Sequence, residues 1–231
     1  MTDLHSPALD LTIERLVSAP RKPGQVMKVG IFAGIHGDEE AGCLAAHELA
    51  RWASDRPPEV NDFELHFFPV CNPSGISLRT RHSHSGLDLN RQFWCDCAEP
   101  EIIFLEAELR RECYDGIISL HSDDTSDGCY GFVSGDLLSA HLLEPALQAA
   151  SEFLPRNELT VIDGFHAEHG IIKEGYLGIL RAPPDQRPHA LEIVFETPAL
   201  APLDLQVQAT VAAVKSILAE YRELQAYAAN L

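Results

Sequence analysis

Apolar segments that suit buried strands alternate along the chain with segments of helical spacing, and this alternation constrains the fold more than any other feature. The predicted strands lie at residues 25–33, 63–70, 115–121 and 189–196. Helical spacing of apolar residues occurs at 41–52, 100–113, 134–153 and 207–224. Mostly continuous apolar runs are typical of strands buried on both faces of a sheet. The pattern therefore predicts a single α/β domain over residues 1–231, with a central mixed, largely parallel sheet and helices on both faces.

The overall charge and the hydropathy of the chain limit the classes of partner. The 231 residues carry a formal net charge of −18, which disfavours nucleic acid and anionic membranes as partners. The sequence contains no run of about 18 apolar residues, so it predicts no membrane span. Its first residues lack the basic and then apolar order of a signal peptide. We therefore expect a cytoplasmic protein; the sequence does not indicate an oligomeric state.

The six cysteines are expected to be free thiols, because a long chain without a signal peptide does not favour a disulfide framework. Cys95-Asp96-Cys97 is an alternative zinc pair. It lacks a second cysteine pair at the spacing of a structural zinc site.

A histidine and a glutamate, His36 and Glu39, lie where the first predicted strand gives way to the first predicted helix. That edge of an open α/β sheet is where such folds bind their ligands. Imidazole nitrogen and carboxylate oxygen are both zinc ligands. The pair therefore predicts two ligands of one metal ion, with Glu40 as an alternative to Glu39.

His121 and Glu196 each end a further predicted strand. If the strands are parallel, both side chains emerge at the same edge of the sheet as the first pair. Two histidines and one glutamate form a catalytic zinc set that leaves a fourth position open for water. A carboxylate outside this set is then needed to take the proton of the water and deliver it to the leaving group. Glu196 is available for that, and Glu192, on the same face of the strand, is the alternative.

Several short motifs occur in a fixed order between about residues 29 and 198. They are His36-Gly37-Asp38-Glu39, Asn72-Pro73-Ser74-Gly75, Asp88-Leu89-Asn90-Arg91 followed by Phe93, Ser119-Leu120-His121 and Phe195-Glu196. In this order they resemble the motifs of the zinc carboxypeptidase superfamily. That superfamily includes carboxypeptidase A, the murein peptide amidases and the succinylglutamate desuccinylase and aspartoacylase branch.

The resemblance implies a metal site and a reaction. His36, Glu39 and His121 would bind one Zn²⁺, and Glu196 would be the general base and acid. Water held between zinc and Glu196 would attack the carbonyl of an amide (peptide) bond that lies next to a substrate carboxylate.

The resemblance also implies positively charged groups for the substrate. The family has an arginine upstream of the Asn-Arg pair that stabilises the oxyanion. Arg79 and Arg81 both lie there, and Arg81 fits the family pattern better. Asn90 and Arg91 would bind the substrate carboxylate, which a guanidinium can hold through two parallel hydrogen bonds. Alternatively, Arg91 and Asp88 only pair with each other and shape the loop.

Two other functions remain open. The first is hydrolysis of an N-acyl amino acid, as the desuccinylase and aspartoacylase branch implies, although the chain is too short for the C-terminal β domain that we associate with aspartoacylase. The second is a catalytically silent metal- or ligand-binding protein on the same scaffold, which would not need Glu196. Tyr176 lies in the region of the substrate-capping tyrosine of carboxypeptidase A, without a matching context.

Other polar residues offer weaker sites. His166 and His169 form a rival metal pair, but glycines flank it and it does not end a predicted strand. His82 and His84 lie in the loop before the Asn-Arg pair. Both are expected to be solvated, with a place in the lining of the cleft as the alternative. Asp123 and Asp124, directly after His121, are expected to be solvated turn residues; the alternatives are support of the metal ligands or a second metal site.

Overall fold

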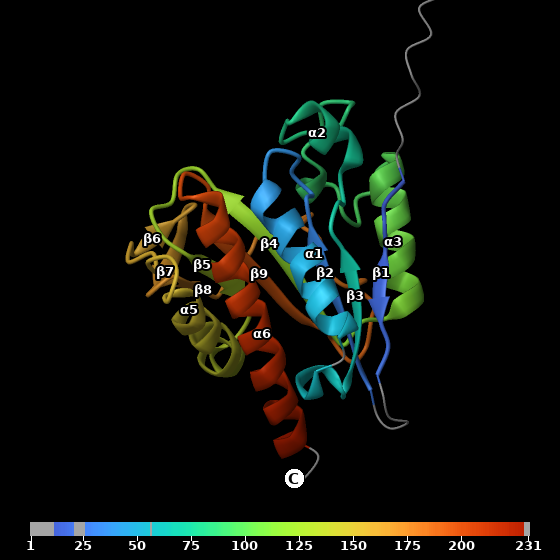
Figure 1. Cartoon of the computed structure of the whole chain (residues 1–231). Coiled ribbons are helices and arrows are strands. Elements are labelled where there is room, and N and C mark those ends of the chain that lie inside the picture. Colours follow the sequence, from blue (N-terminus) through green and yellow to red (C-terminus); the bar gives the residue numbers. More distant parts are fainter. Residues whose placement is uncertain (1–11, 21–25, 56, 229–231) are drawn as a thin grey trace, which may run out of the picture.

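Residues 12–20, 26–55 and 57–228 are described by a computed structural model, and within them nine strands form one mixed sheet in the order β1-β3-β2-β4-β9-β5-β8-β7-β6 (Figure 1). The strands are β1 (Leu16–Ser18), β2 (Met27–Ala33), β3 (Phe63–Phe68), β4 (Gly116–Asp123), β5 (Tyr130–Val133), β6 (Val161–Ile162), β7 (Phe165–Glu168), β8 (Ile171–Ile172) and β9 (Leu191–Pro198). The helices are α1 (Glu40–Ser54), α2 (Pro73–Leu78), α3 (Pro100–Glu112), α4 (Asp136–Leu138), α5 (Glu144–Ala150) and α6 (Leu203–Ala228). Short 3₁₀ or π turns are η1 (Pro58–Val60), η2 (Leu89–Arg91) and η3 (Ser139–Leu143).

The centre of the sheet is parallel, as the apolar strands predict. Strands β3, β2, β4 and β9 run side by side in the same direction, whereas β1 and β5 pair antiparallel with β3 and β9. The carboxyl ends of the central strands therefore lie at one edge. In this register His121 of β4 is directly opposite Glu196 of β9, and Glu196 is directly opposite Tyr130 of β5.

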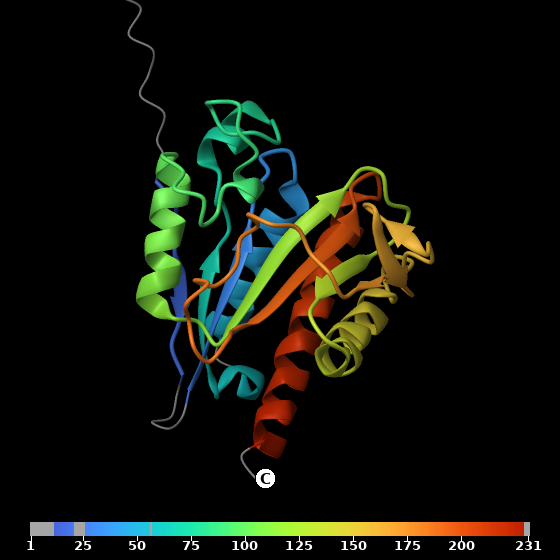
Figure 2. The ribbon, with the colours of Figure 1, turned by 180° about the vertical axis from the view of Figure 1, so that it is seen from behind.

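Two layers of helices cover the sheet. Helices α1, α5 and α6 pack on one face over an apolar cluster that includes Ile31, Ile118 and Phe195, and they stand in front of the sheet in Figure 1. Helix α3 packs on the other face, where Leu105 and Leu109 belong to a cluster with strand residues of that face; Figure 2 shows this side. The predicted fold class, with helices on both faces, is confirmed.

The structure differs from the sequence prediction in several segments. For residues 71–96 the sequence predicted neither a helix nor a strand, but this segment contains helix α2. The helix has only six residues, which is too short to show a helical period of apolar residues. Asn72 caps it by accepting a hydrogen bond from the Gly75 N–H at 2.8 Å, and Arg79 ends it in the left-handed region at φ 52°. The helix predicted at 134–153 is divided into α4, η3 and α5. Strands β1 and β5 were not predicted, because three or four residues carry too little pattern.

None of the helices within the described ranges combines the length and apolar character that crossing a bilayer requires.

An ion-pair group ties α3 to the sheet and gives a prediction about stability. The carboxylate of Glu112 accepts hydrogen bonds from Arg15 at 2.7 Å, Lys28 at 2.8 Å and Arg111 at 3.0 Å. Burial alone would raise the pKa of Glu112, but these donors lower the pKa to about 2. Glu112→Gln is expected to lower the free energy of unfolding by about 1 kcal/mol at neutral pH, measured by chemical denaturation.

The pH dependence supplies the control. Because the pKa of Glu112 is lowered by folding, its contribution is full above the unfolded pKa of about 4.3 and is lost as the pH falls toward 2. The variant and the wild type should therefore converge near about pH 2. Glu223→Gln, at an exposed carboxylate, should match the wild type throughout. An equal gap at neutral and acidic pH would contradict the ion-pair account.

Candidate active site

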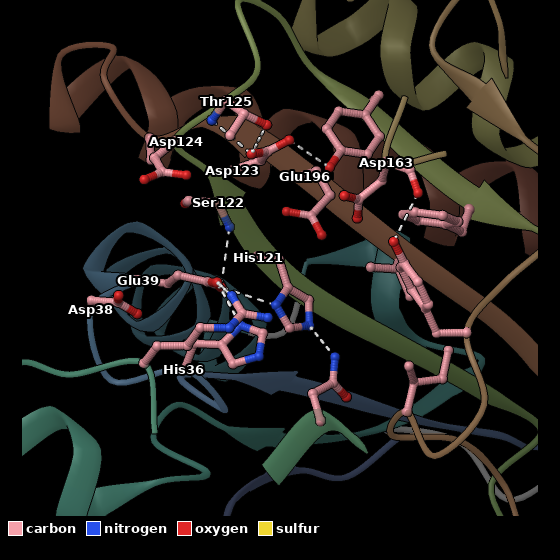
Figure 3. A pocket seen from close by; sticks show the side chains of 18 of the residues that line it. His36, Asp38, Glu39, His121, Ser122, Asp123, Asp124, Thr125, Asp163 and Glu196 are labelled. Atoms are coloured by element: carbon pink, nitrogen blue, oxygen red, sulfur yellow. Dashed lines mark hydrogen bonds and ion pairs between the residues drawn. The ribbon is translucent and has the colours of Figure 1, made fainter. Parts of the chain in front are cut away.

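His36, Glu39 and His121 meet at the carboxyl edge of the central strands (Figure 3). Nδ1 of His36 lies 2.6 Å from one carboxylate oxygen of Glu39, and Nδ1 of His121 lies 2.9 Å from the other. All three side chains are buried, and their ligand atoms lie within 4.8 Å of one another. The neighbouring imidazoles lower the pKa of Glu39 against the opposing effect of its burial, so the group is a carboxylate.

Two glycines allow the loop between β2 and α1 to reach this position. Gly34 has φ +62°, a backbone conformation that suits glycine. A Cβ at Gly37 would lie 1.9 Å from the backbone carbonyl carbon of Gly75. Only glycine therefore allows the loop between β2 and α1 to pack this closely against the start of α2. The Gly37 N–H also donates to the Thr80 carbonyl at 3.0 Å. Helix α2 and the residues that follow it therefore hold the loop that carries His36 in place.

The outer nitrogens of both histidines have their own partners. Nε2 of His36 lies 3.2 Å from Asp88 Oδ1, and Nε2 of His121 lies 3.0 Å from Ser119 Oγ. Such partners fix the ring orientation of metal-binding histidines. Both Nδ1 atoms face Glu39, and in the tautomer that carries its proton on Nε2 each Nδ1 presents a lone pair that can bind a metal. The donor set and its surroundings thus fit a zinc ion of the two-histidine, one-glutamate type.

A second group of similar residue types is occupied by other contacts. Glu64, His66 and Glu112 also have ligand atoms within 4.8 Å of one another. Lys28 lies 2.8 Å from Glu112 and 3.6 Å from Glu64, and Nδ1 of His66 lies 2.9 Å from the Tyr114 hydroxyl. The ammonium group already supplies the positive charge that a metal would bring, so we assign this group to the stability of the fold.

Arg81 joins the site through Asp88. The Arg81 guanidinium donates from Nε and Nη2 to Asp88 Oδ2 at 3.2 and 3.1 Å, and its Nη1 lies 3.6 Å from Glu39. Arg79 is exposed at the end of α2 and does not line the cavity. The alternative pairing of Asp88 with Arg91 is not the one that forms: Asp88 bridges His36 and Arg81.

Glu196 lies beside the candidate metal ligands His36, Glu39 and His121 without belonging to that group. Its carboxylate points into the cavity in Figure 3. It has no hydrogen-bond partner among the described residues. Burial raises the pKa of Glu196; the imidazole of His121 opposes this, and the negative charges of Glu39 and Asp123 add to it. A carboxyl group with a raised pKa and free oxygens can take up a proton and release it again.

Asn90 and Arg91 lie on the wall of a cavity of about 510 Å³ that also contains the metal-binding group. Asn90 Oδ1 accepts from the Leu180 N–H at 2.9 Å, and Nδ2 lies 3.5 Å from His121 Nε2. Arg91 donates from Nη1 to the Asn90 carbonyl at 2.7 Å and lies 4.1 Å from the centre of the Tyr176 ring. Most of the Arg91 donors thus remain available to a ligand.

Tyr176 and two residues near Glu196 contribute more than the sequence suggested. The Tyr176 hydroxyl donates to the Asp163 carbonyl at 2.9 Å, which holds the ring under Arg91. Asp123 was expected to be a solvated turn residue, yet it lines the cavity and accepts a hydrogen bond from the Tyr130 hydroxyl at 2.9 Å. Tyr130 could not be found from the sequence, because its strand was not recognised.

The weaker candidates do not join the site. Glu40 is exposed at the start of α1, and Glu192 accepts from the Ala182 N–H at 2.9 Å away from the metal-binding group. His166 and His169 are exposed, and His169 pairs with Glu158. Cys95 and Cys97 take part in no metal-type group among the described residues, and the six cysteines are free thiols.

Comparison with known proteins identifies the same type of fold. A protein from Shewanella baltica described as a metallopeptidase superposes with a TM-score of 0.75 at 24% identity, over 90% of this chain and 81% of that chain. A metallo-carboxypeptidase from Pseudomonas aeruginosa, solved with (2-guanidinoethylmercapto)succinic acid, has a TM-score of 0.68 at 19% identity, over 92% of this chain and 61% of that chain. Carboxypeptidase SOL1 of Arabidopsis thaliana is 33% identical over 82 residues, a match that spans 31% of this chain and 17% of that protein.

The fold and the site together define the class, a hydrolase with the metallocarboxypeptidase fold. The model of the succinylglutamate desuccinylase/aspartoacylase catalytic domain matches residues 25–164. The chain belongs to that family, and the predicted membership of the wider zinc carboxypeptidase group is thereby confirmed.

Proposed function

We propose that the protein is a zinc-dependent hydrolase that cleaves an amide bond next to a carboxylate of a small substrate. One observation carries the proposal: Glu196, a carboxylate without a hydrogen-bond partner among the described residues, is directly opposite the metal-binding histidine His121 on the neighbouring strand. A protein that only binds metal would not need this second group. The proposal therefore disfavours the catalytically silent alternative.

His36, Glu39 and His121 would hold the zinc ion. When bound, zinc polarises a carbonyl group and lowers the pKa of nearby water to about 7. Glu196 takes a proton from the attacking water and delivers it to the nitrogen of the leaving amine, so the carbon–nitrogen bond breaks with a neutral leaving group. The raised pKa of Glu196 favours its protonated form, and that form is needed to deliver the proton to the leaving amine.

The two arginines on the cavity wall would bind the oxygens of the substrate. Arg81, kept in place by Asp88, would donate hydrogen bonds to the oxyanion that forms when water adds to the carbonyl. Arg91 would hold the substrate carboxylate through its planar fork, and the amide NH2 group of Asn90 would add a neutral donor.

Two substrate classes meet these requirements. A peptide with a free carboxylate, including a cell-wall peptide, is our first choice, and the fold shared with metallopeptidases agrees with it. An N-acyl amino acid is the second, and it is favoured by the desuccinylase and aspartoacylase family to which the chain belongs. Assays with dipeptides, murein peptides and N-acyl amino acids would separate the two classes. Zinc binding without turnover of any of them would favour the silent alternative.

Arg91→Lys tests the carboxylate site. Lysine keeps the positive charge but cannot form two parallel hydrogen bonds, so we expect the KM of the best substrate to rise about tenfold with little change in kcat. Steady-state kinetics on the zinc-loaded protein would measure both constants. Arg79→Lys, at an arginine outside the cavity, is the matched control and should behave as the wild type. Equal KM values for Arg91→Lys and the wild type would remove Arg91 from the carboxylate site.

A further inference from the structure

A buried glutamine on α6 connects the two strands that carry His121 and Glu196. Gln206 is 4% exposed, and its Oε1 accepts from Ser122 Oγ at 3.2 Å and from Thr197 Oγ1 at 3.3 Å. Its Nε2 donates to the carbonyls of Ala199 at 3.1 Å and Ala201 at 2.7 Å. An amide can make four such bonds, and Gln206 makes all of them inside the protein.

The residues that Gln206 holds follow the catalytic candidates directly in sequence. Ser122 comes after His121, and Thr197 comes after Glu196. Successive side chains of a strand point to opposite faces of the sheet. His121 and Glu196 therefore face the cavity while Ser122 and Thr197 face α6, where the two hydroxyls also lie 3.0 Å from each other.

This pair interrupts an apolar pattern. On the face toward α6, the earlier pairs of β4 and β9 are Ile118 with Ile193 and Leu120 with Phe195. The next pair in the same register is Ser122 with Thr197. Apolar contacts would suffice to bury these positions, but they are not directional. Hydrogen bonds fix both distance and direction, and a fully satisfied buried network makes the local structure rigid.

The network also reaches the metal-binding group. The Ser122 N–H donates to Glu39 Oε2 at 3.2 Å, and the Thr197 hydroxyl shares its one proton between Gln206 Oε1 and the His121 carbonyl, which lies 3.4 Å from Oγ1. We propose that Gln206 is a positioning residue that sets the placement of His121, Glu39 and Glu196 relative to one another through Ser122 and Thr197. The inference rests on the proposed function, because it names what holds that site together.

Gln206→Met is the direct test, because methionine keeps the length and shape of the side chain but makes none of the four hydrogen bonds. We expect the zinc affinity, measured by competition with a chromophoric chelator, to fall about tenfold. We expect kcat to fall by a similar factor while KM stays within about twofold. Thr210→Val is the matched control: its hydroxyl is buried one turn further along α6 and bonds only to the Gln206 carbonyl. It should leave zinc affinity and kcat unchanged.

Other results would decide against the inference. If Gln206→Met melts at a lower temperature but keeps zinc affinity and kcat within twofold of the wild type, Gln206 serves only stability. If that variant does not fold, Thr197→Val removes one of the bridging hydroxyls, and an unchanged zinc affinity there would overturn the inference. If the wild type binds no zinc, the proposed function fails separately. Amide hydrogen exchange of residues 121–123, 196 and 197 in the metal-free protein then tests Gln206 by itself, and unchanged exchange in Gln206→Met would count against it.

Discussion

Glu196→Gln is expected to lower kcat by about a thousandfold while the protein still binds zinc. Glutamine keeps the size and polarity of the side chain but cannot accept the proton of the attacking water. Glu196 is not one of the residues that would hold the metal, so its loss should affect the chemical step more than the affinity for zinc or substrate. Metal analysis and steady-state kinetics on the same preparation would measure both effects.

Glu192→Gln is the matched control for this result. Glu192 lies on the same face of β9, four residues before Glu196 and so further from the edge, and its carboxylate accepts from the Ala182 N–H. Its substitution should leave kcat within a few-fold of the wild type. Full activity of Glu196→Gln would show that the mechanism is wrong, and a large loss in Glu192→Gln alone would move the role of general base to that residue.

His121→Ala is expected to abolish tight zinc binding and to reduce activity to the background rate. The substitution removes one of three metal ligands and leaves the buried carboxylate of Glu39 without one of its imidazole partners. Zinc content after dialysis and activity before and after addition of zinc would measure the effect. A chelator should remove the activity of the wild type in the same way, and added zinc should restore it.

His84→Ala separates this effect from a general response to losing a histidine. His84 is exposed and does not line the cavity. The variant should therefore keep both zinc and activity. Activity that survives removal of the metal from the wild type, or full zinc occupancy in His121→Ala, would contradict the assignment of the metal site.

The sequence was sufficient to predict the parts of the molecule that depend on local patterns. Continuous apolar runs revealed the central strands, and the ends of those strands led to His36, His121 and Glu196. This worked because parallel strands place their carboxyl ends at a common edge. The family resemblance then selected Arg81 over Arg79, and the structure places Arg81 at the cavity.

The remaining parts depend on contacts between residues far apart in the chain. Asp88 is 52 positions from His36, and no local pattern shows that it bridges His36 and Arg81. Strand β5 is only four residues long and lacks polar alternation, so Tyr130 beside Glu196 was missed. The bonds of Gln206 were hidden for a similar reason: the predicted helix began only at residue 207, and Ser122 and Thr197 lie 84 and 9 positions from Gln206.

The histidines proposed to bind the metal and part of the cavity wall come from different parts of the fold. His36 and His121 follow or end central strands of the sheet, whereas Arg91 and Tyr176 belong to connecting segments at its periphery. Such segments tolerate replacement better than central strands. A new specificity is therefore expected from exchanging residues 163–182 between related proteins, because that range leaves His36, Arg81 and Glu196 unchanged. The residues proposed to bind the metal and to transfer the proton thus lie at the ends of central strands, whereas part of the wall proposed to contact the substrate belongs to a connecting segment.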